Sequence, residues 1–243
     1  VRFGVSPFGI WTTQSSVASA HSLTLPSGIT GSDMYEQIYC DPVAWMEAGT
    51  VDYISPQLYW KTTSTGQDYD VLCPWWSKLA KTMTDRRTDG KKIHFYSSMT
   101  RSSTENSESN LQIERNRTSD VMSAPGAIFY NTTNFKLNSY PTELSSSSGK
   151  FYRQALPPAI DWKTHSTLPA PTNLAVSGTS MTWQYKSSSA ANTEARFSIY
   201  CYPKGTDAAT AMANPAYLLG MSYSPSFTLS SSYNSSYTYA VCT

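Results

Sequence analysis

The residues best suited to chemistry lie in one segment, residues 51–60, which alternates polar and apolar side chains and ends on two aromatic rings. If this segment is a strand, Ser55, Gln57 and Tyr59 share one face, because successive side chains of a strand point to opposite sides. Their hydroxyl and amide groups are neutral hydrogen-bond donors and acceptors. Such groups match the hydroxyl and N-acetyl groups of sugars, so the segment predicts a carbohydrate-binding surface.

The same alternation extends this polar face to other strands. The four predicted strands are 2–8, 51–59, 92–99 and 127–131. The predicted substrate-binding side chains on these strands are Ser6, Gln57, Tyr59, Tyr96, Ser98 and Asn131, with Phe8 and Ser55 beside them. For Ser6 and Gln57 the alternative is ordinary packing, in which neighbouring side chains satisfy one another.

Two tryptophans follow the ends of predicted strands. Trp11 and Trp60 could expose indole faces that stack on the C–H surface of a pyranose, and the alternative is hydrophobic packing within loops. The adjacent Trp75 and Trp76 differ, because neighbouring residues on a helix point about 100° apart and cannot both face one ligand. We assign this pair to structure and expect at least Trp75 to pack against the sheet.

Segments of mixed character separate the four strands, an order typical of a parallel α/β sheet. A short helix is predicted at 42–48, with Asp41 as its N-cap and Pro42 in its first turn. A longer helix is predicted at 70–84 and a third at 111–122. The apolar stripe of the longer helix is Val71, Leu72, Trp75, Leu79 and Met83.

The pattern changes to short strands separated by turns after residue 157, which predicts a small β-sandwich. Its predicted strands are 169–176, 181–183, 197–201 and 237–241. The prolines between 157 and 171 favour a semi-rigid spacer. We therefore predict one domain at 1–157, a linker at 158–168 and a second domain at 169–243.

Composition excludes several classes of protein. The 243 residues carry a net charge of +1 with only 14% charged residues, which lacks the basic footprint of a nucleic-acid-binding protein. The abundance of serine and tyrosine is common in exported carbohydrate-handling proteins. The four cysteines have no C-x-x-C spacing, so neither a metal nor a cofactor is predicted. For Cys201 and Cys242, in two strands of the second domain, a disulfide and free thiols both stay open.

The second domain resembles a fibronectin type III domain over residues 169–243. Residues 171–176 resemble the first strand of that family, 181–183 the strand with its core tryptophan, and 237–241 the strand with its tyrosine corner. The resemblance implies a further final strand beyond residue 243, so we expect a truncated sandwich.

The first domain resembles the bacterial glycosyl hydrolase-like 10 family over about 1–140. Four motifs match in order and at comparable spacing: Phe3–Trp11, Tyr39–Pro42, Val51–Trp60 and Trp75–Trp76. The resemblance implies a TIM-barrel catalytic domain in which 3–8 corresponds to roughly the fifth strand. We therefore expect a partial TIM barrel of about four βα units. Its open edges should be covered by a second copy, by Ser-rich loops or by crystal neighbours.

The resemblance also bears on catalysis. Glycoside hydrolysis needs two carboxyl groups about 5–9.5 Å apart. In the resembled family the acidic cluster precedes Phe3, outside this chain. Asp41 is better explained as a helix cap, and Asp52 begins its strand at the face away from the chemistry, so the chain alone should be inactive.

Two functions follow from the resemblance. The first is part of a bacterial cell-envelope glycoside hydrolase that acts on glycan strands, with peptidoglycan as a candidate. The alternative is a non-catalytic carbohydrate-binding or adhesion module. In either case we expect an exported protein of the periplasm or cell surface, with any lipid anchor carried by a segment outside this chain.

Overall fold

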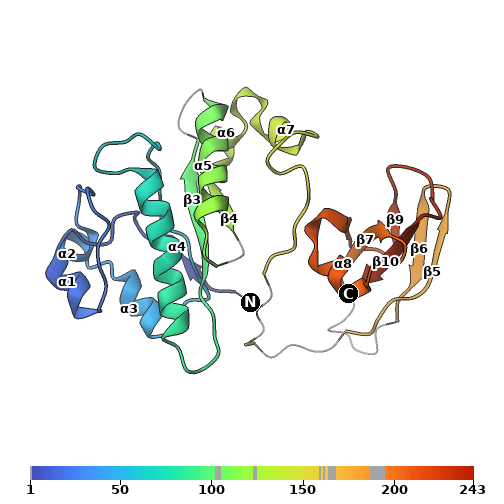
Figure 1. Cartoon of the computed structure of the whole chain (residues 1–243), viewed down its shortest axis with the longest axis horizontal. Coiled ribbons are helices and arrows are strands. Elements are labelled where there is room, and N and C mark those ends of the chain that lie inside the picture. Colours follow the sequence, from blue (N-terminus) through green and yellow to red (C-terminus); the bar gives the residue numbers. More distant parts are fainter. Residues whose placement is uncertain are drawn as a thin grey trace. The chain divides into compact units, whose positions relative to one another are not determined.

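The chain forms two compact units, each with a hydrophobic core of its own (Figure 1). The computed structural model describes residues 2–101, 105–122, 125–158, 160, 162–163, 168–186 and 195–243. The first unit comprises residues 1–150 and 160–162, and the second comprises 151–159 and 163–243. Most of the predicted linker lies outside the described residues.

The first unit is built on four parallel strands in the order β1-β2-β3-β4. The strands are β1 (Gly4–Val5), β2 (Tyr53–Ile54), β3 (His94–Thr100) and β4 (Gly126–Tyr130). Single bridges from Gln57 to Phe8 and to Ser98 continue the parallel alignment beyond β1 and β2. The prediction of a parallel α/β sheet is confirmed, and among the described residues β1 and β4 form its two edges.

Several helices accompany this sheet, including three that the sequence predicts with slightly different bounds. They are α1 (Ser15–Ala20), α2 (Met34–Ile38), α3 (Pro42–Glu47), α4 (Tyr69–Asp85), α5 (Asn106–Ser119), α6 (Thr132–Phe135), η1 (Leu137–Ser139) and α7 (Tyr140–Ser145). The predicted cap of α3 is confirmed, because the Asp41 side chain accepts a hydrogen bond from the Ala44 amide at 3.1 Å. Figure 1 shows α4 and α5 side by side along the sheet.

Helix α4 packs on the sheet through a stripe that shares Leu72, Leu79 and Met83 with the predicted one and has Trp76 as its fully buried tryptophan. Leu72, Trp76, Leu79 and Met83 are buried, at spacings of four, three and four residues that keep them on one side of a helix. Of the predicted tryptophan pair, Trp75 is only partly buried against this core. It is Trp76 that is fully buried, and its Nε1 donates a hydrogen bond to the Gly9 carbonyl at 2.8 Å.

The two faces of the sheet have different surroundings. On one face, which we call the covered face, Ile54, Phe95 and Met99 belong to the same buried cluster as the α4 side chains. The opposite face, which we call the open face, leaves Phe8 46% and Tyr130 56% exposed. Parallel sheets are normally buried on both faces, so the open face is unusual. Its aligned residues are Gly4, Ser6, Phe8, Tyr53, Ser55, Gln57, His94, Tyr96, Ser98, Thr100, Gly126, Ile128 and Tyr130.

The second unit contains two antiparallel sheets of three strands each, in the orders β5-β6-β9 and β10-β7-β8. The strands are β5 (Thr172–Ser177), β6 (Ser180–Gln184), β7 (Phe197–Pro203), β8 (Leu218–Ser222), β9 (Ser226–Thr228) and β10 (Tyr237–Cys242). Met181 and Trp183 pack with Phe197 and Ile199 between the sheets. The predicted antiparallel β structure is confirmed.

A short helical segment, which the sequence analysis did not predict, accompanies these strands. It consists of α8 (Ala208–Ala213) and η3 (Pro215–Tyr217). Ala211 of α8 is buried in a separate cluster with Tyr200 and Tyr202 of β7. Strand β7 is therefore packed on both of its faces.

The four cysteines are free thiols. Cys201 pairs across the ladder with Tyr239, so Cys242 lies three positions farther along β10 and points to the opposite side of the sheet. This arrangement resolves the two open alternatives for Cys201 and Cys242 in favour of free thiols. Cys73 in α4 is buried, and burial raises the pKa of its thiol to about 11, so we expect an unreactive, protonated group.

Candidate functional site

The strand register brings polar side chains from separate strands into rows on the open face. Gln57 is aligned with Phe8 on one side and with Ser98 on the other, and Ser98 pairs with Ile128 of β4. Residues aligned in neighbouring parallel strands point to the same side of the sheet. The structure therefore brings Gln57 and Ser98 together on one surface, as the sequence alternation predicts.

A second row lies two residues nearer the N-terminal ends of the strands. It contains Ser6, Ser55 and Tyr96. The residues directly before these three, Val5, Ile54 and Phe95, are aligned with one another, and the alignment of Phe8, Gln57 and Ser98 two residues later keeps the same register. Ser6 is exposed, whereas Ser55 is 1% exposed and its hydroxyl has no hydrogen-bond partner among the described residues.

Tyr96 presents a neutral phenol to this surface. Arg2 donates a hydrogen bond from Nη1 to the Tyr96 hydroxyl at 3.2 Å. Burial raises the pKa of Tyr96 above its usual value, and the nearby Arg2 charge only partly offsets that effect. The hydroxyl therefore stays protonated at neutral pH and can both donate and accept hydrogen bonds.

Two glycines allow tyrosine rings to lie across the open face. A Cβ atom at Gly4 would clash with the Tyr53 ring, and one at Gly126 would clash with the Tyr96 ring. The two rings approach each other, with centroids 5.3 Å apart. The glycines of the edge strands thus leave room for the Tyr53 and Tyr96 rings, which we call the aromatic floor of the open face.

The C-terminal ends of the strands carry a third group of side chains. The hydroxyls of Tyr59 and Ser98 lie 3.3 Å apart, and the Tyr59 ring stacks on Tyr130 with centroids 5.6 Å apart. Tyr130 was not among the predicted site residues, although it pairs with Thr100 and therefore shares the open face. Alternation along β4 puts Gly126, Ile128 and Tyr130 on one face, so the strand pattern was the available signal for Tyr130.

Asn131 and Gln57 use their side chains within the protein. The Asn131 side chain accepts a hydrogen bond from the Asn134 amide at 3.1 Å and caps α6. Strand β4 and its register end at Tyr130, so a place for Asn131 on the open face stays a prediction. Gln57 donates its Nε2 to the Ser6 carbonyl at 3.0 Å, so its side chain is tied to the neighbouring strand segment.

Neither predicted tryptophan platform is exposed. Trp11 is 2% exposed and lies edge-on to the His21 and Tyr35 rings, so the expectation of an exposed indole face is wrong. Trp60 is half-buried and packs against the hydrophobic core, while its carbonyl accepts a hydrogen bond from Gln112 Nε2 at 2.9 Å. Both residues follow the alternative interpretation of hydrophobic packing.

Two carboxylates near the C-terminal end of β3 were overlooked by the sequence analysis. Glu105 and Glu108 line a small hollow of about 30 Å³ together with Tyr59 and Arg101. Glu108 accepts hydrogen bonds from the Thr62 amide at 2.8 Å and from Gln112 at 2.9 Å, so it holds the 61–62 segment in place. Their position directly after a predicted parallel strand was the available signal.

Arg101 and Asp52 serve the structure. The Arg101 guanidinium is buried, donates to Asn106 Oδ1 and to the Asn134 carbonyl, and lies over the Tyr140 ring at 5.2 Å. The Asp52 carboxylate accepts a hydrogen bond from the Phe3 amide at 2.7 Å at the N-terminal end of the sheet. The expectation that Asp52 lies away from the C-terminal ends of the strands agrees with this position.

Searches for a metal site and for a membrane span give no candidate in the described part of the chain. No three histidine, cysteine, aspartate or glutamate side chains come together there as ligands for a metal ion. No helix in the same residues combines the length and the apolar character needed to cross a bilayer.

Comparison with known proteins connects this geometry to a family. Residues 1–103 match the family model of Glycosyl hydrolase-like 10. This part of the chain is therefore similar to glycosyl hydrolase-like proteins. The chain is 40% identical over 96 residues to "Glycosyl hydrolase DigH" of Escherichia coli strain K12, a match that covers 40% of this chain and 20% of that protein.

A second relative extends the match along the chain. "Glycosyl hydrolase YngK" of Bacillus subtilis strain 168 is 28% identical over 171 residues, which covers 67% of this chain and 31% of that protein. The chain thus spans between a fifth and a third of the length of these curated relatives. The matches support a glycoside hydrolase-like function for the first part of the chain.

Proposed function

We propose that this chain forms one side of the substrate cleft of a glycoside hydrolase that acts on glycan strands, with peptidoglycan as the first candidate. The observation that carries the proposal is the C-terminal end of the open face, where the Gln57 amide, the hydroxyls of Tyr59 and Ser98 and the Tyr130 ring gather. In α/β barrels the active site lies at those ends. The similarity of residues 1–103 to glycosyl hydrolases supports a sugar as ligand.

The proposal includes a barrel of which this sheet is one part. Helices pack on one face of the four strands and leave Phe8, Ile128 and Tyr130 of the other face exposed, which is compatible with strands around the lumen of a (β/α)₈ barrel. Four strands do not close a barrel, and unpaired strand edges invite pairing. Further parallel strands, from another segment of a longer protein or from a second copy, would pair with β1 and β4.

The chemistry available on the open face is binding and orientation. None of the aligned residues of the open face carries a carboxylate, whereas glycoside hydrolysis uses two. In this proposal the hydroxyls of Ser6 and Tyr96 donate and accept hydrogen bonds to sugar hydroxyls, and the buried Ser98 holds the Tyr59 hydroxyl in place. The exposed Tyr130 ring offers an apolar surface to the sugar C–H groups. The acid and the base come from outside the open face.

The second unit is proposed as a fibronectin type III-like spacer or docking element. The packing of sheet β5-β6-β9 on sheet β10-β7-β8, with Trp183 in the core, supports this proposal. So does the hydroxyl of Tyr239, which accepts a hydrogen bond from the Asn234 amide at 3.2 Å. A tyrosine bonded to backbone a few residues upstream is the pattern of a tyrosine corner.

A carbohydrate-binding or adhesion module is the second candidate function. It is favoured by the same absence of carboxylates from the aligned residues of the open face. For both candidates we propose an exported protein of the cell envelope, which the abundance of tyrosine and serine and the low charged fraction of 14% support.

The test compares binding and turnover of peptide-free glycan strands. We expect the 243-residue chain to bind them without releasing fragments, and Tyr130→Ala to weaken binding about tenfold or more. The matched control is Val121→Ala, an exposed apolar truncation beyond the end of α5. A longer protein that contains this chain should release fragments. Binding by that protein without release would favour the second candidate, and equal binding by both variants would contradict a role for the open face.

A further inference from the structure

A cavity of about 320 Å³ lies beside the segment that follows β1. Its walls come from residues 9–13, from α1, from residues 23–29 and from the first half of α4. None of the predicted site residues except Trp11 lines it. The volume lies within the range of about 300–1,000 Å³ that is typical of small-molecule sites.

The lining of this cavity is uncharged. Hydroxyl groups of Thr12, Ser15, Ser19 and Ser27 alternate with apolar groups, and the indoles of Trp11 and Trp75 contribute aromatic surface. No lysine, arginine, aspartate, glutamate or histidine is among the described residues that line it. Such a lining disfavours ions and suits a neutral ligand that carries both hydroxyl groups and an apolar face.

Several hydrogen-bonding groups of the lining have no partner. Ser15, Ser19 and Ser27 are exposed, and their hydroxyls, which make no hydrogen bond to any residue that the structure describes, are accessible to a ligand. The Trp11 indole Nε1 is buried and likewise lacks a partner in the described part of the chain. Buried donors are nearly always paired, so an acceptor supplied by a ligand is a natural complement.

A buried carboxylate fixes one wall of the cavity. Asp33 accepts hydrogen bonds from the Thr12 hydroxyl at 2.8 Å, from the Thr13 amide at 2.9 Å and from the Glu36 amide at 3.0 Å. Burial alone would raise the pKa of Asp33, but these hydrogen bonds outweigh it and the pKa lies below its usual value. Asp33 therefore stays ionised and holds Thr12 and Thr13 in place.

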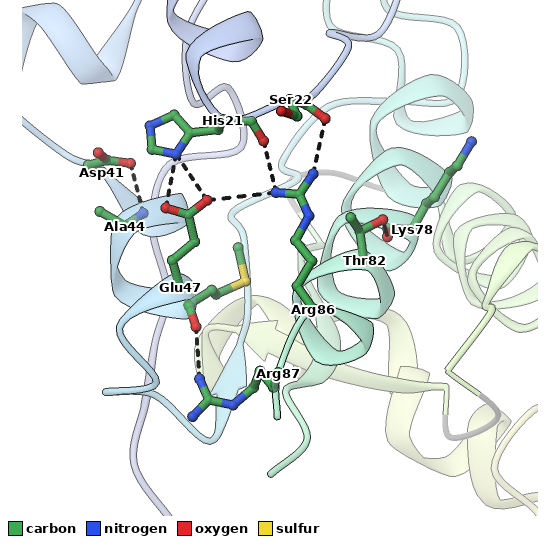
Figure 2. A network of polar contacts seen from close by, with 10 residues as sticks. His21, Ser22, Asp41, Ala44, Glu47, Lys78, Thr82, Arg86 and Arg87 are labelled. Carbon is green, nitrogen blue, oxygen red and sulfur yellow. Dashed lines mark hydrogen bonds and ion pairs between the residues drawn. The ribbon is translucent and has the colours of Figure 1, made fainter. Parts of the chain in front are cut away.

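A second set of contacts fixes the segment that closes the cavity. Trp75 Nε1 donates to the Thr24 carbonyl at 2.8 Å. Arg86, at the end of α4, donates to the carbonyls of His21 and Ser22 at 2.8 and 3.0 Å, and Ser22 has a left-handed φ of 54°. Figure 2 shows Arg86 and Glu47 converging on this turn, where Glu47 lies 3.0 Å from His21 Nδ1. Walls held in this way need little reordering when a ligand enters.

We propose that this cavity is a binding subsite for one neutral sugar residue of a glycan, separate from the open face. The class of ligand rests on the proposed function, whereas the location rests on the cavity and its uncharged, hydroxyl-rich lining. The sugar hydroxyls or an N-acetyl oxygen would pair with the free serines, and its C–H face would pack on Trp75.

The test measures the affinity of the 243-residue chain for N,N′,N″-triacetylchitotriose by titration calorimetry. Ser19→Trp places a large side chain in the cavity from the exposed side of α1, and Ser27→Trp does so from the closing segment. Ser16→Trp is the matched control, because Ser16 is exposed on the same helix and does not line the cavity. Circular dichroism checks that each variant folds.

The proposal predicts that Ser19→Trp and Ser27→Trp each weaken the trisaccharide about tenfold or more, while Ser16→Trp changes its affinity less than about twofold. Unchanged affinity in both cavity variants, with weaker binding by Tyr130→Ala, would overturn the subsite and leave the proposed function intact. No binding of the trisaccharide by the unmodified chain would overturn the subsite as well. Weakening by Ser16→Trp equal to that by Ser19→Trp would also contradict it.

Discussion

The two faces of the four-stranded sheet use the same strands for different purposes. On the covered face Phe95 and Met99 are buried against the helices, and on the open face Tyr96 and Ser98 of the same strand present polar groups beside tyrosine rings. Strand alternation alone generates this division. The covered face therefore supplies buried packing that stabilises the first unit. The open face is the one that we propose for binding.

The largest expected effect tests that division by truncating one aromatic side chain on each face. Phe95→Ala should lower the free energy of unfolding by about 3–5 kcal/mol, because it removes a buried ring and leaves a cavity. Phe8→Ala should change it by less than about 1 kcal/mol, since Phe8 is nearly half exposed. Urea unfolding of both variants measures the difference. Comparable losses would show that the open face also serves as core.

A second expected effect concerns the hydrogen bonds that Asp33 accepts from Thr12 and Thr13, which stabilise the first unit by polar contacts where Phe95 does so by apolar packing. Asp33→Asn should lower the free energy of unfolding by about 2 kcal/mol at neutral pH, because charge-assisted hydrogen bonds to Thr12 and Thr13 become neutral ones. The folded-state pKa of Asp33 is lowered, so its contribution is fully present above the unfolded pKa of about 3.9. That contribution is lost as the pH falls through the folded pKa.

The pH dependence supplies the measurement for Asp33. Unfolding free energies of the unmodified chain and of Asp33→Asn, measured between about pH 2 and pH 7, should converge as the pH falls below the unfolded pKa. The loss caused by Phe95→Ala should stay constant over the same range, because no titrating group is removed. A constant gap between Asp33→Asn and the unmodified chain would contradict the assigned role of the carboxylate.

The smallest expected effect concerns the aromatic floor of the open face. Gly126→Ala should cost about 1–2 kcal/mol, since the new Cβ meets the Tyr96 ring and the ring must move. In a Tyr96→Ala background the same substitution should cost much less, which a double-mutant cycle detects. Equal costs in both backgrounds would mean that the ring does not depend on the glycine.

Local patterns predicted much of the first unit. The alternation in 51–59 was enough to place Gln57 beside Ser98 on one surface, because alternation is a property of any strand. The N-cap at Asp41 was also correct, because the preference for aspartate before Pro42 is local. The parallel pairing followed from the alternation of strands with helices.

The errors come from features that only tertiary packing decides. Trp75 and Trp76 are equally compatible with an amphipathic helix, and the position of α4 on the sheet selects Trp76 for the core. Trp11 is buried because it packs with Tyr35 and His21, which are distant in sequence. The place of Tyr130 on the open face was missed because the end of β4 was placed one residue too late, and a shift of one residue reverses the face.

The most direct test of the account follows the tyrosines of both faces by fluorine NMR of the chain labelled with 3-fluorotyrosine, with signals assigned by single Tyr→Phe variants. On titration with N,N′,N″-triacetylchitotriose, the signals of Tyr59, Tyr96 and Tyr130 on the open face should shift. The signal of Tyr69, which is buried on the covered side and hydrogen-bonded to Ser97 at 2.9 Å, should not. Saturable binding that leaves the three open-face signals unchanged would contradict the claim that this face binds the glycan.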